Sequence, residues 1–184
     1  MKLVWPSREY LASYVAALER GWSPDNLRAA KAQEELEGIA ADADAFLASL
    51  IDREGAGPPI VLPDGTTVPR LPSYQRWMWD GEFSGTVGIR WQPGTETLPE
   101  HCLGHVGYGV VPWKRSRGYA TRALGEFLPE ARAEGLRYVE LCTDPENTAS
   151  RRVIEANGGV LVGEFATIEA YGRKSKLRYR IALT

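Results

Sequence analysis

Strand patterns and helix patterns alternate in the second half of this chain, and their order limits the possible folds more than any other feature. Two runs with the two-residue period of strands, at residues 74–79 and 82–91, flank Asp80-Gly81, a dipeptide typical of tight hairpin turns. We therefore expect an α/β fold of three layers with a mixed sheet, antiparallel at first and with at least one parallel pair joined by a crossover helix. The elements expected after the hairpin are strand 103–111, helix 118–134, strand 137–142, helix 145–157, and strands 159–165 and 176–183.

The first half of the chain predicts two helices and then a loop. Apolar residues recur at helical spacing over residues 7–21, and a second helix pattern runs from the cap-and-proline pair Ser23-Pro24 to about Arg53. Residues 55–73 hold five prolines and three glycines, which rules out long regular elements there. A small hairpin around residues 64–65 is the exception that this loop allows.

Composition favours one soluble domain. The 184 residues are 43% hydrophobic, enough to bury a core, so we expect a single domain over 1–184, built from parts 1–54, 55–73 and 74–184. A net charge of -2 gives no global basic surface, which argues against nucleic acid or an anionic membrane as partner. The chain shows no signal-peptide pattern and no apolar run long enough for a membrane span, so we expect a cytoplasmic location.

The cysteines and histidines do not have the spacing of a metal site. Cys102, Cys142, His101 and His105 lack the paired CxxC or HxxxH pattern that zinc sites use. No metal is therefore expected, and both cysteines are expected to be buried free thiols.

The segment after the third strand collects positive charge and glycine where a helix begins. The strand ends at Val111, a loop with Arg115 and Arg117 follows, and the helix starts near Gly118. Free backbone N–H groups at a helix N-terminus attract anions, and glycine lets a bulky phosphate approach the backbone. The spacing matches neither GxxxxGK[ST] nor GxGxxG, so a phosphate carrier other than those of the P-loop and Rossmann folds is predicted.

Residues 115–120, Arg-Ser-Arg-Gly-Tyr-Ala, resemble the [Q/R]xxGx[G/A] motif of the GCN5-related N-acetyltransferases (GNAT family). A second segment, "NTASRRVIEANGG" at 147–159, is similar to the family's Asn-x-x-Ser/Ala…Glu-x-x-Gly segment. The likeness is good over 74–165, whereas 1–54 fits the family's first strand and two helices more loosely. It implies a three-layer α-β-α fold with a centrally splayed sheet, and transfer of an acetyl group from acetyl-CoA to a primary amine of a small molecule, protein or peptide.

Carried over residue by residue, the resemblance implies three sets of cofactor contacts. The backbone of Val110 and Val111 would pair with the pantetheine amides, as if the cofactor were an extra strand. Asn147 and Ser150 would hydrogen-bond the pantetheine or a phosphate. The diphosphate would be held by Arg115, Ser116, Arg117, Gly118, Tyr119, Ala120 and Thr121.

The proton donor for the departing thiolate is the one part of the family pattern that this chain lacks. Many relatives have a tyrosine seven residues after the motif Asn147, where this chain has Ile154. Tyr108 is the first candidate for that role, with a core aromatic as the alternative. His105 could act as base or substrate ligand, or be a structural histidine.

The acceptor amine is left open by the sequence. Trp22, in the turn between the first two helices, and Arg90, at a strand end, are candidate substrate contacts; a packed ring and a solvated or ion-paired arginine are the alternatives. A homodimer is common in similar proteins. The competing functions are a non-catalytic sensor of CoA or acyl-CoA, which Ile154 favours, and an unrelated domain that binds a phosphate ligand.

Overall fold

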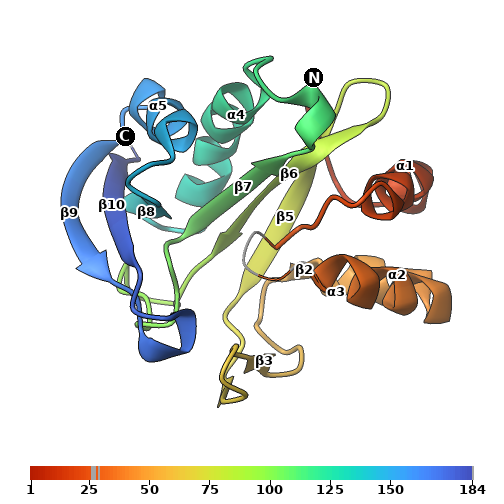
Figure 1. Ribbon diagram of the computed structural model, residues 1–184, viewed down its shortest axis with the longest axis horizontal. Coiled ribbons are helices and arrows are strands. Elements are labelled where there is room, and N and C mark those ends of the chain that lie inside the picture. The colour runs from red at the N-terminus through yellow and green to blue at the C-terminus, as the bar shows by residue number, and fades with distance from the viewer. Residues whose placement is uncertain (26–27, 29, 184) are drawn as a thin grey trace.

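Two main sheets lie next to each other in the computed structural model of the protein, which describes residues 1–25, 28 and 30–183 (Figure 1). The larger sheet has the order β1-β5-β6-β7, with β2 also paired to β5, and the smaller has the order β8-β10-β9. β3 and β4 form a separate hairpin, as predicted around Asp64-Gly65. The strands are Lys2–Val4 (β1), Ile51–Asp52 (β2), Ile60–Val61 (β3), Thr67–Val68 (β4), Ser73–Trp79 (β5), Phe83–Arg90 (β6), Val106–Val110 (β7), Tyr138–Thr143 (β8), Val160–Ala166 (β9) and Ser175–Ala182 (β10).

Helices cover the larger sheet on both faces, which makes the three layers that the sequence predicts (Figure 1). On one face lie α1 (Arg8–Glu19), α2 (Lys31–Ala41) and α3 (Ala43–Ser49). On the other lies α4 (Tyr119–Ala133), and α5 (Thr148–Ala156) lies beside α4 against β8 of the smaller sheet. The predicted helices at 118–134 and 145–157 are thus confirmed, as is the hairpin of β5 and β6 around Asp80-Gly81.

The long helix predicted for residues 23–53 is wrong in two respects. Asp42 has extended backbone angles (φ -158°, ψ 98°) and accepts the N–H groups of Asp44 and Ala45, both at 3.0 Å, so it ends α2 and caps α3. At the start, Ser23 Oγ accepts the N–H of Asp25 at 3.3 Å in a turn, and α2 begins only at Lys31. The parts of the prediction that fall on residues 26–27 and 29 lie outside the described residues.

The predicted parallel ladder is also wrong, because every ladder among the described residues is antiparallel. Helix α4 does connect β7 to β8, but the two strands meet only where the residues just before β7 lie beside the middle of β8. There the His105 N–H donates to the Glu140 carbonyl (2.7 Å), and Gly104 forms an isolated antiparallel bridge with Leu141. The sheet is therefore split between β7 and β8, and β7 keeps one edge without a strand partner.

Two hydrophobic cores hold the layers together. One lies between the sheets and α4 and α5, and contains Met78, Phe127 and Tyr179. The other lies beneath α1 and α3, where the Tyr14 ring stacks on Trp77 with centroids 4.5 Å apart. The two cores bury both faces of β5 and β6. Since β7 pairs with β6, packing on both faces of the sheet fixes the position of β7 and of the split beside it.

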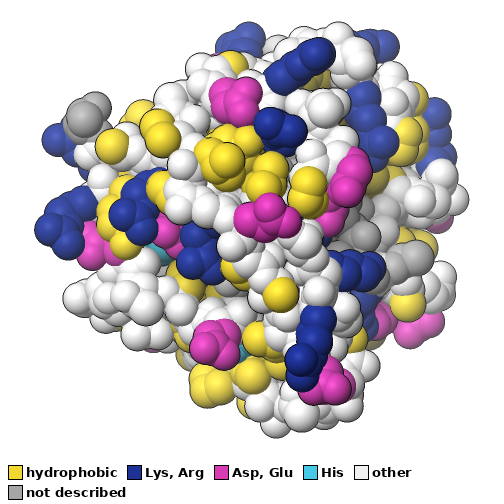
Figure 2. All heavy atoms as spheres, turned by 60° about the vertical axis from the view of Figure 1, so that its left-hand side comes forward, with side chains coloured by type: hydrophobic (Ala, Val, Ile, Leu, Met, Phe, Trp, Pro, Cys, Tyr) yellow, Lys and Arg dark blue, Asp and Glu magenta, His cyan; other side chains and the backbone are white. Residues whose placement is uncertain are grey.

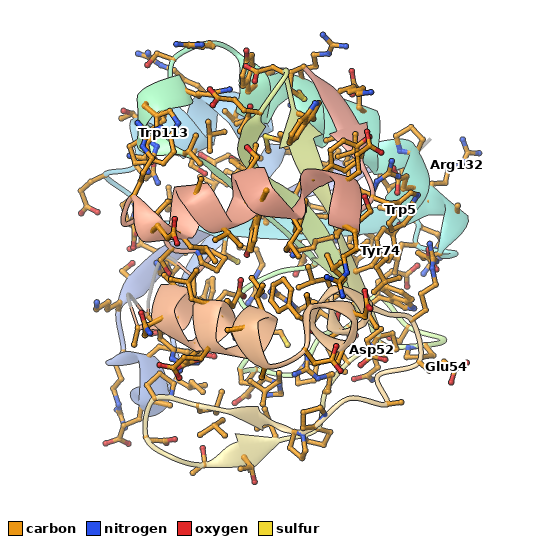
Figure 3. The ribbon with its side chains drawn as sticks, turned by 90° about the vertical axis from the view of Figure 1, so that its right-hand side faces the viewer. Trp5, Asp52, Glu54, Tyr74, Trp113 and Arg132 are labelled. Atoms are coloured by element: carbon orange, nitrogen blue, oxygen red, sulfur yellow. The ribbon has the colours of Figure 1, made fainter. Side chains whose placement is uncertain are left out.

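Aromatic contacts extend these cores to the surface. The rings of Trp5, just after β1, and Tyr74, on β5, have centroids 5.4 Å apart, and the guanidinium of Arg20 lies 3.8 Å from the Trp113 ring (Figure 3). These tryptophans pack against neighbours. On the side of β9, hydrophobic side chains gather on the surface (Figure 2), and β9 exposes Val160, Leu161 and Val162.

Candidate active site

The edge of β7 that faces the split carries free backbone groups. On the other edge, the Val111 N–H donates to the Ser84 carbonyl at 3.1 Å, which sets the alternation of the β6–β7 ladder. In an antiparallel pair, alternate residues direct both N–H and C=O to the same side. The backbone groups of Tyr108 and Val110 therefore point away from β6, and the Val110 carbonyl accepts a hydrogen bond from Arg115 Nε at 3.2 Å.

Six consecutive backbone N–H groups, of residues 116–121, have no acceptor among the residues that the structure describes. Ser116 and Gly118 take the left-handed conformation (φ 61° and 74°), which curves the loop just before α4. The first helical hydrogen bond of this region is from the Arg122 N–H to the Gly118 carbonyl at 3.0 Å. Free N–H groups at a helix N-terminus, beside exposed arginines, form a binding site for an anion.

A buried ion pair anchors this loop to the turn between β5 and β6. Lys114 Nζ, with only 4% of the side chain exposed, contacts Asp80 and lies 2.9 Å from Glu82 Oε1, and the Tyr119 hydroxyl donates to Asp80 Oδ2 at 2.6 Å. Burial alone would raise the pKa of Asp80, but the hydrogen bonds from Lys114 and Tyr119 outweigh it and hold that pKa well below its ordinary value. The Tyr119 side chain is thus occupied, and this residue offers the anion site its backbone.

Tyr108 reaches across the split. Its side chain packs against the core beneath α4 and α5, together with Val106 and Val110, as strand alternation predicts. The hydroxyl lies 2.9 Å from Ser150 Oγ and donates to the Ser150 carbonyl at 3.2 Å. Burial raises the pKa of Tyr108 to about 12, against the opposing effect of the Ser150 hydrogen bond. The phenol is therefore protonated at neutral pH, and its hydroxyl lies between β7 and the first turn of α5.

Helix α5 brings the second sequence segment to the same place. Asn147 caps the helix, and its Oδ1 accepts the Ser150 N–H at 3.0 Å, which leaves its Nδ2 free of any acceptor among the described residues. Ile154 points into the core with 1% of its surface exposed. A Cβ on Gly159 would come within 2.3 Å of Ile154 Cγ2, so the glycine is needed for this packing.

His105 lies at the closed end of the split and is fully buried. Its Nδ1 accepts the Glu140 N–H at 3.0 Å, whereas its Nε2 has no partner among the described residues. Burial lowers the pKa of His105, so the ring is neutral. The structure places this histidine as a link between β7 and β8.

His105→Gln is expected to make folding less sensitive to mild acid. Because the native pKa is lowered, the unfolded chain binds more protons than the native one below about pH 6.5, and stability is lost as the pH falls. Glutamine can still accept the Glu140 N–H but does not titrate. Denaturant unfolding of both proteins from about pH 7.5 to about 5.5 should show the variant losing less free energy of unfolding; an equal loss in both would contradict this account of His105.

The two candidate substrate contacts lie in different environments. Trp22 is buried in the core under α1, with its ring 5.9 Å from Tyr14 and 5.0 Å from Phe83. Arg90 is exposed at the end of β6, and its guanidinium donates to the Gly104 carbonyl at 3.2 Å. Of the two, Arg90 is accessible to a ligand.

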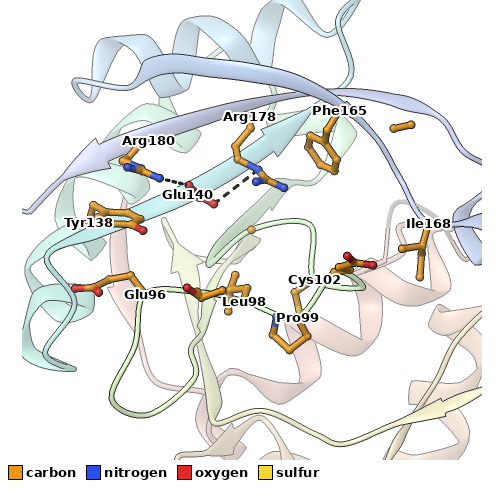
Figure 4. Close-up of a pocket in the computed structure, with 14 residues that line it drawn as sticks. Glu96, Leu98, Pro99, Cys102, Tyr138, Glu140, Phe165, Ile168, Arg178 and Arg180 are labelled. Atoms are coloured by element: carbon orange, nitrogen blue, oxygen red, sulfur yellow. Dashed lines mark hydrogen bonds and ion pairs between the residues drawn. The ribbon is translucent and has the colours of Figure 1, made fainter.

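A cavity of about 620 Å³ lies between the smaller sheet and loop 91–105, and the sequence analysis did not identify it (Figure 4). Arg178 and Arg180 line it from β10, Tyr138 and Glu140 from β8. A sequence signal existed in the alternation of "KLRYRIAL", where two arginines share one face of a strand whose other face is apolar.

Metal and membrane features are absent from the described part of the chain. No group of three or more metal-ligating side chains occurs there, and no helix in it has the length and apolar character needed to cross a bilayer. Cys102 and Cys142 are free, as predicted, but only partly buried.

Comparisons with known proteins agree with this architecture. The family model described as "Acetyltransferase (GNAT) domain" matches residues 15–160. A search of curated proteins found no match.

Among solved structures, the chain is similar to the microcin C7 self-immunity acetyltransferase MccE, whose structure is a complex with acetyl-CoA and AMP (13% identity, 98% of this chain and 91% of that chain covered, TM-score 0.62). It is also similar to an acetyl transferase from Salmonella typhimurium that modifies the N-terminal serine of ribosomal protein L7/L12 (12% identity, 99% and 94% covered, TM-score 0.62). A third similar structure is a putative ribosomal-protein-serine acetyltransferase from Vibrio cholerae (14% identity, 98% and 92% covered, TM-score 0.57). At these identities the likeness establishes the fold.

Proposed function

Because the chain belongs to the GNAT acetyltransferase family, we propose that it moves an acetyl group from acetyl-CoA to a primary amine by direct attack in a ternary complex. The observation that carries this proposal is the free edge of β7, which leads directly to the six unpaired N–H groups of residues 116–121. An extended amide-bearing arm that ends in a diphosphate matches both features at once.

In the proposed complex, the pantetheine arm pairs with the backbone N–H and carbonyl of Val110 beside Val111 on the edge of β7 that faces away from β6. In the structure, Arg115 Nε donates a hydrogen bond to the Val110 carbonyl. Binding of the arm would displace this hydrogen bond, and the Arg115 side chain would turn toward the diphosphate. Asn147, through its free Nδ2, and Ser150 line the same split from α5. The diphosphate lies against the N-terminus of α4, within reach of Ser116, Arg117, Gly118, Tyr119, Ala120 and Thr121.

Tyr108 is the proposed proton donor. The neutral amine attacks the thioester carbonyl, its nitrogen loses a proton to water, and the tetrahedral intermediate collapses as the C–S bond breaks and releases the CoA thiolate. A phenol with a pKa of about 12 stays protonated at neutral pH and can transfer its proton to the departing sulfur. The tyrosinate that remains after the donor has protonated this thiolate regains its proton from water. Ser150, which contacts the hydroxyl, orients it toward the split. In this proposal Tyr108, on β7, donates the proton that Ile154 cannot donate.

Ligand-induced stabilisation and thiol release test the proposal. Acetyl-CoA and CoA should raise the melting temperature while ATP does not, because a ligand at about 100 times its Kd adds roughly 2.7 kcal/mol to the stability of the folded state. Acetyl-CoA with a panel of amines and peptides should then release CoA thiol. A shift selective for ATP would overturn the proposed cofactor; binding of CoA without thiol release from any amine would leave a non-catalytic sensor.

A further inference from the structure

The cavity of Figure 4 lies on the face of the sheets from which the acceptor must come. On β8, Val139 and Leu141 point into the core beneath α4 and α5, so Tyr138 and Glu140 point to the opposite face, where the cavity is. The proposed cofactor site is formed by the N-termini of α4 and α5. A second substrate therefore approaches the split from the face that holds the cavity.

Part of the strand surface between the cavity and the split carries no side chain. Gly104 lines the cavity and packs against β8, where a Cβ would come within 2.7 Å of the Glu140 carbonyl oxygen, and Gly107 and Gly109 follow on β7 and share one face of that strand. A Cβ built on either of these two glycines would meet nothing within 4 Å. From Gly104 to Tyr108 the chain advances four residues, or roughly 13 Å at about 3.3 Å per residue.

Arg178 is the arginine of this cavity that is best placed to bind a ligand. Its guanidinium stacks on the Phe165 ring at 4.4 Å, and its Nε lies 3.7 Å from Glu140 Oε2. The thiol of Cys142, the β8 partner of Arg178, also interacts with this guanidinium, whereas no oxygen acceptor among the described residues hydrogen-bonds its two terminal nitrogens. Gly163, the β9 partner of Arg178, contributes no side chain, and a Cβ there would also meet nothing within 4 Å. The Phe165 ring thus supports one face of the guanidinium, and Gly163 places no side chain beside Arg178.

Among the described residues, three carboxylates and two arginines line the cavity, and two of the carboxylates have a closer partner than Arg178. Glu140 lies between two guanidinium groups and is closer to Arg180, which donates to its Oε1 at 2.8 Å. Glu96 is paired with Arg137 outside the cavity at 2.7 Å, and Glu100 lies on the exposed rim. The wall opposite Arg178 includes Leu98, Pro99 and Ile168 (Figure 4).

We propose that this cavity binds an anionic end of the acceptor, a carboxylate or a phosphate, through the terminal nitrogens of Arg178. This inference rests on the proposed function and adds the class of acceptor: a molecule with its amine roughly 13 Å from its anionic group, the span of about four extended residues. A planar guanidinium fixed on a ring binds such oxygens in pairs, which sets direction as well as affinity.

Binding of product analogues tests the inference without requiring catalysis. N-acetyl-tetraglycine, its C-terminal amide, and the same peptide ending in an aminoethyl phosphate are titrated calorimetrically into the CoA-saturated protein. We expect the carboxylate or the phosphate form to bind at least about tenfold more tightly than the amide, and Arg178→Gln to remove that preference. Whichever anionic form binds better identifies the group. Arg178→Lys should keep part of the preference, because it retains charge without the paired geometry.

Arg132→Gln, at an exposed position at the far end of α4, is the matched control and should keep the full preference. Equal binding of the amide and both anionic forms, no binding of any of them, or an undiminished preference in Arg178→Gln would each overturn the inference. If the protein acetylated no amine but still bound the anionic analogues more tightly than the amide, this result would contradict the proposed catalysis and leave the proposed anion site standing.

Discussion

Tyr108→Phe is expected to lower kcat for acetyl transfer by about 10²- to 10⁴-fold, the range that general acids contribute. The variant removes one oxygen from a ring that packs in the core beneath α4 and α5, so folding and acetyl-CoA affinity should be preserved. What is lost is the proton that the departing thiolate would take, and the hydrogen bond to Ser150. Steady-state kinetics with a saturating amine, and calorimetry with acetyl-CoA, separate these effects.

The control for this experiment is Tyr10→Phe, which removes a hydroxyl from α1, outside the proposed site. It should keep wild-type kinetics. If Tyr108→Phe turned over like the wild type, the thiolate would leave without this proton, and Tyr108 would be a packing residue. A large rise in the Kd for acetyl-CoA with unchanged kcat would instead assign the hydroxyl to cofactor binding.

Gly118→Glu is expected to weaken acetyl-CoA binding by roughly 100-fold or more, since hydrogen bonds to charged groups contribute about 1.5–3 kcal/mol each. The added carboxylate would lie beside the six free N–H groups of residues 116–121, compete for them, and repel the diphosphate. The thermal stabilisation by acetyl-CoA should disappear. Arg117→Glu should weaken binding less, because it changes the charge without obstructing the backbone.

Two control variants separate charge from backbone strain. Gly118→Ala introduces the same left-handed strain at φ 74°, but its Cβ meets nothing within 4 Å, so binding should fall much less than in Gly118→Glu. Arg132→Glu makes the same change of charge as Arg117→Glu at the other end of α4 and should bind acetyl-CoA normally. Equal losses in Gly118→Ala and Gly118→Glu would show that loop conformation, not charge, controls binding.

Sequence reasoning succeeded where structure depends on neighbouring residues. The Asp80-Gly81 and Asp64-Gly65 hairpins, and the helix that begins after Gly118, follow from turn residues and apolar spacing. It failed at Asp42, where a cap interrupts a continuous helical pattern: aspartate within such a pattern reads as an exposed polar residue until its side chain is seen bonding to the backbone.

In the candidate site, too, the sequence predicted the features that depend on neighbouring residues and missed those that depend on distant ones. The loop of residues 115–121 could be found from its glycine and charge, and its role stays a prediction. The burial of Trp22 could not be read from its place in a turn, because Tyr14 and Phe83, far from it in sequence, enclose its ring. Arg178 carried no local signal that distinguishes it from Arg180; both line the cavity, and the difference is that Arg180 has Glu140 as its close partner at 2.8 Å whereas Arg178 lies 3.7 Å from that carboxylate.

The sequence by itself determined the order of the elements and the loop that ends in free N–H groups, because period, caps and turns act over a few residues. Only the tertiary structure decided that, among the described residues, the chain pairs with β8 just before β7 begins and no further, which leaves the edge of β7 open and brings Tyr108 to Ser150. Strand pairing depends on packing between elements that are distant along the chain, so the residue pattern of one strand does not predict which strand it pairs with.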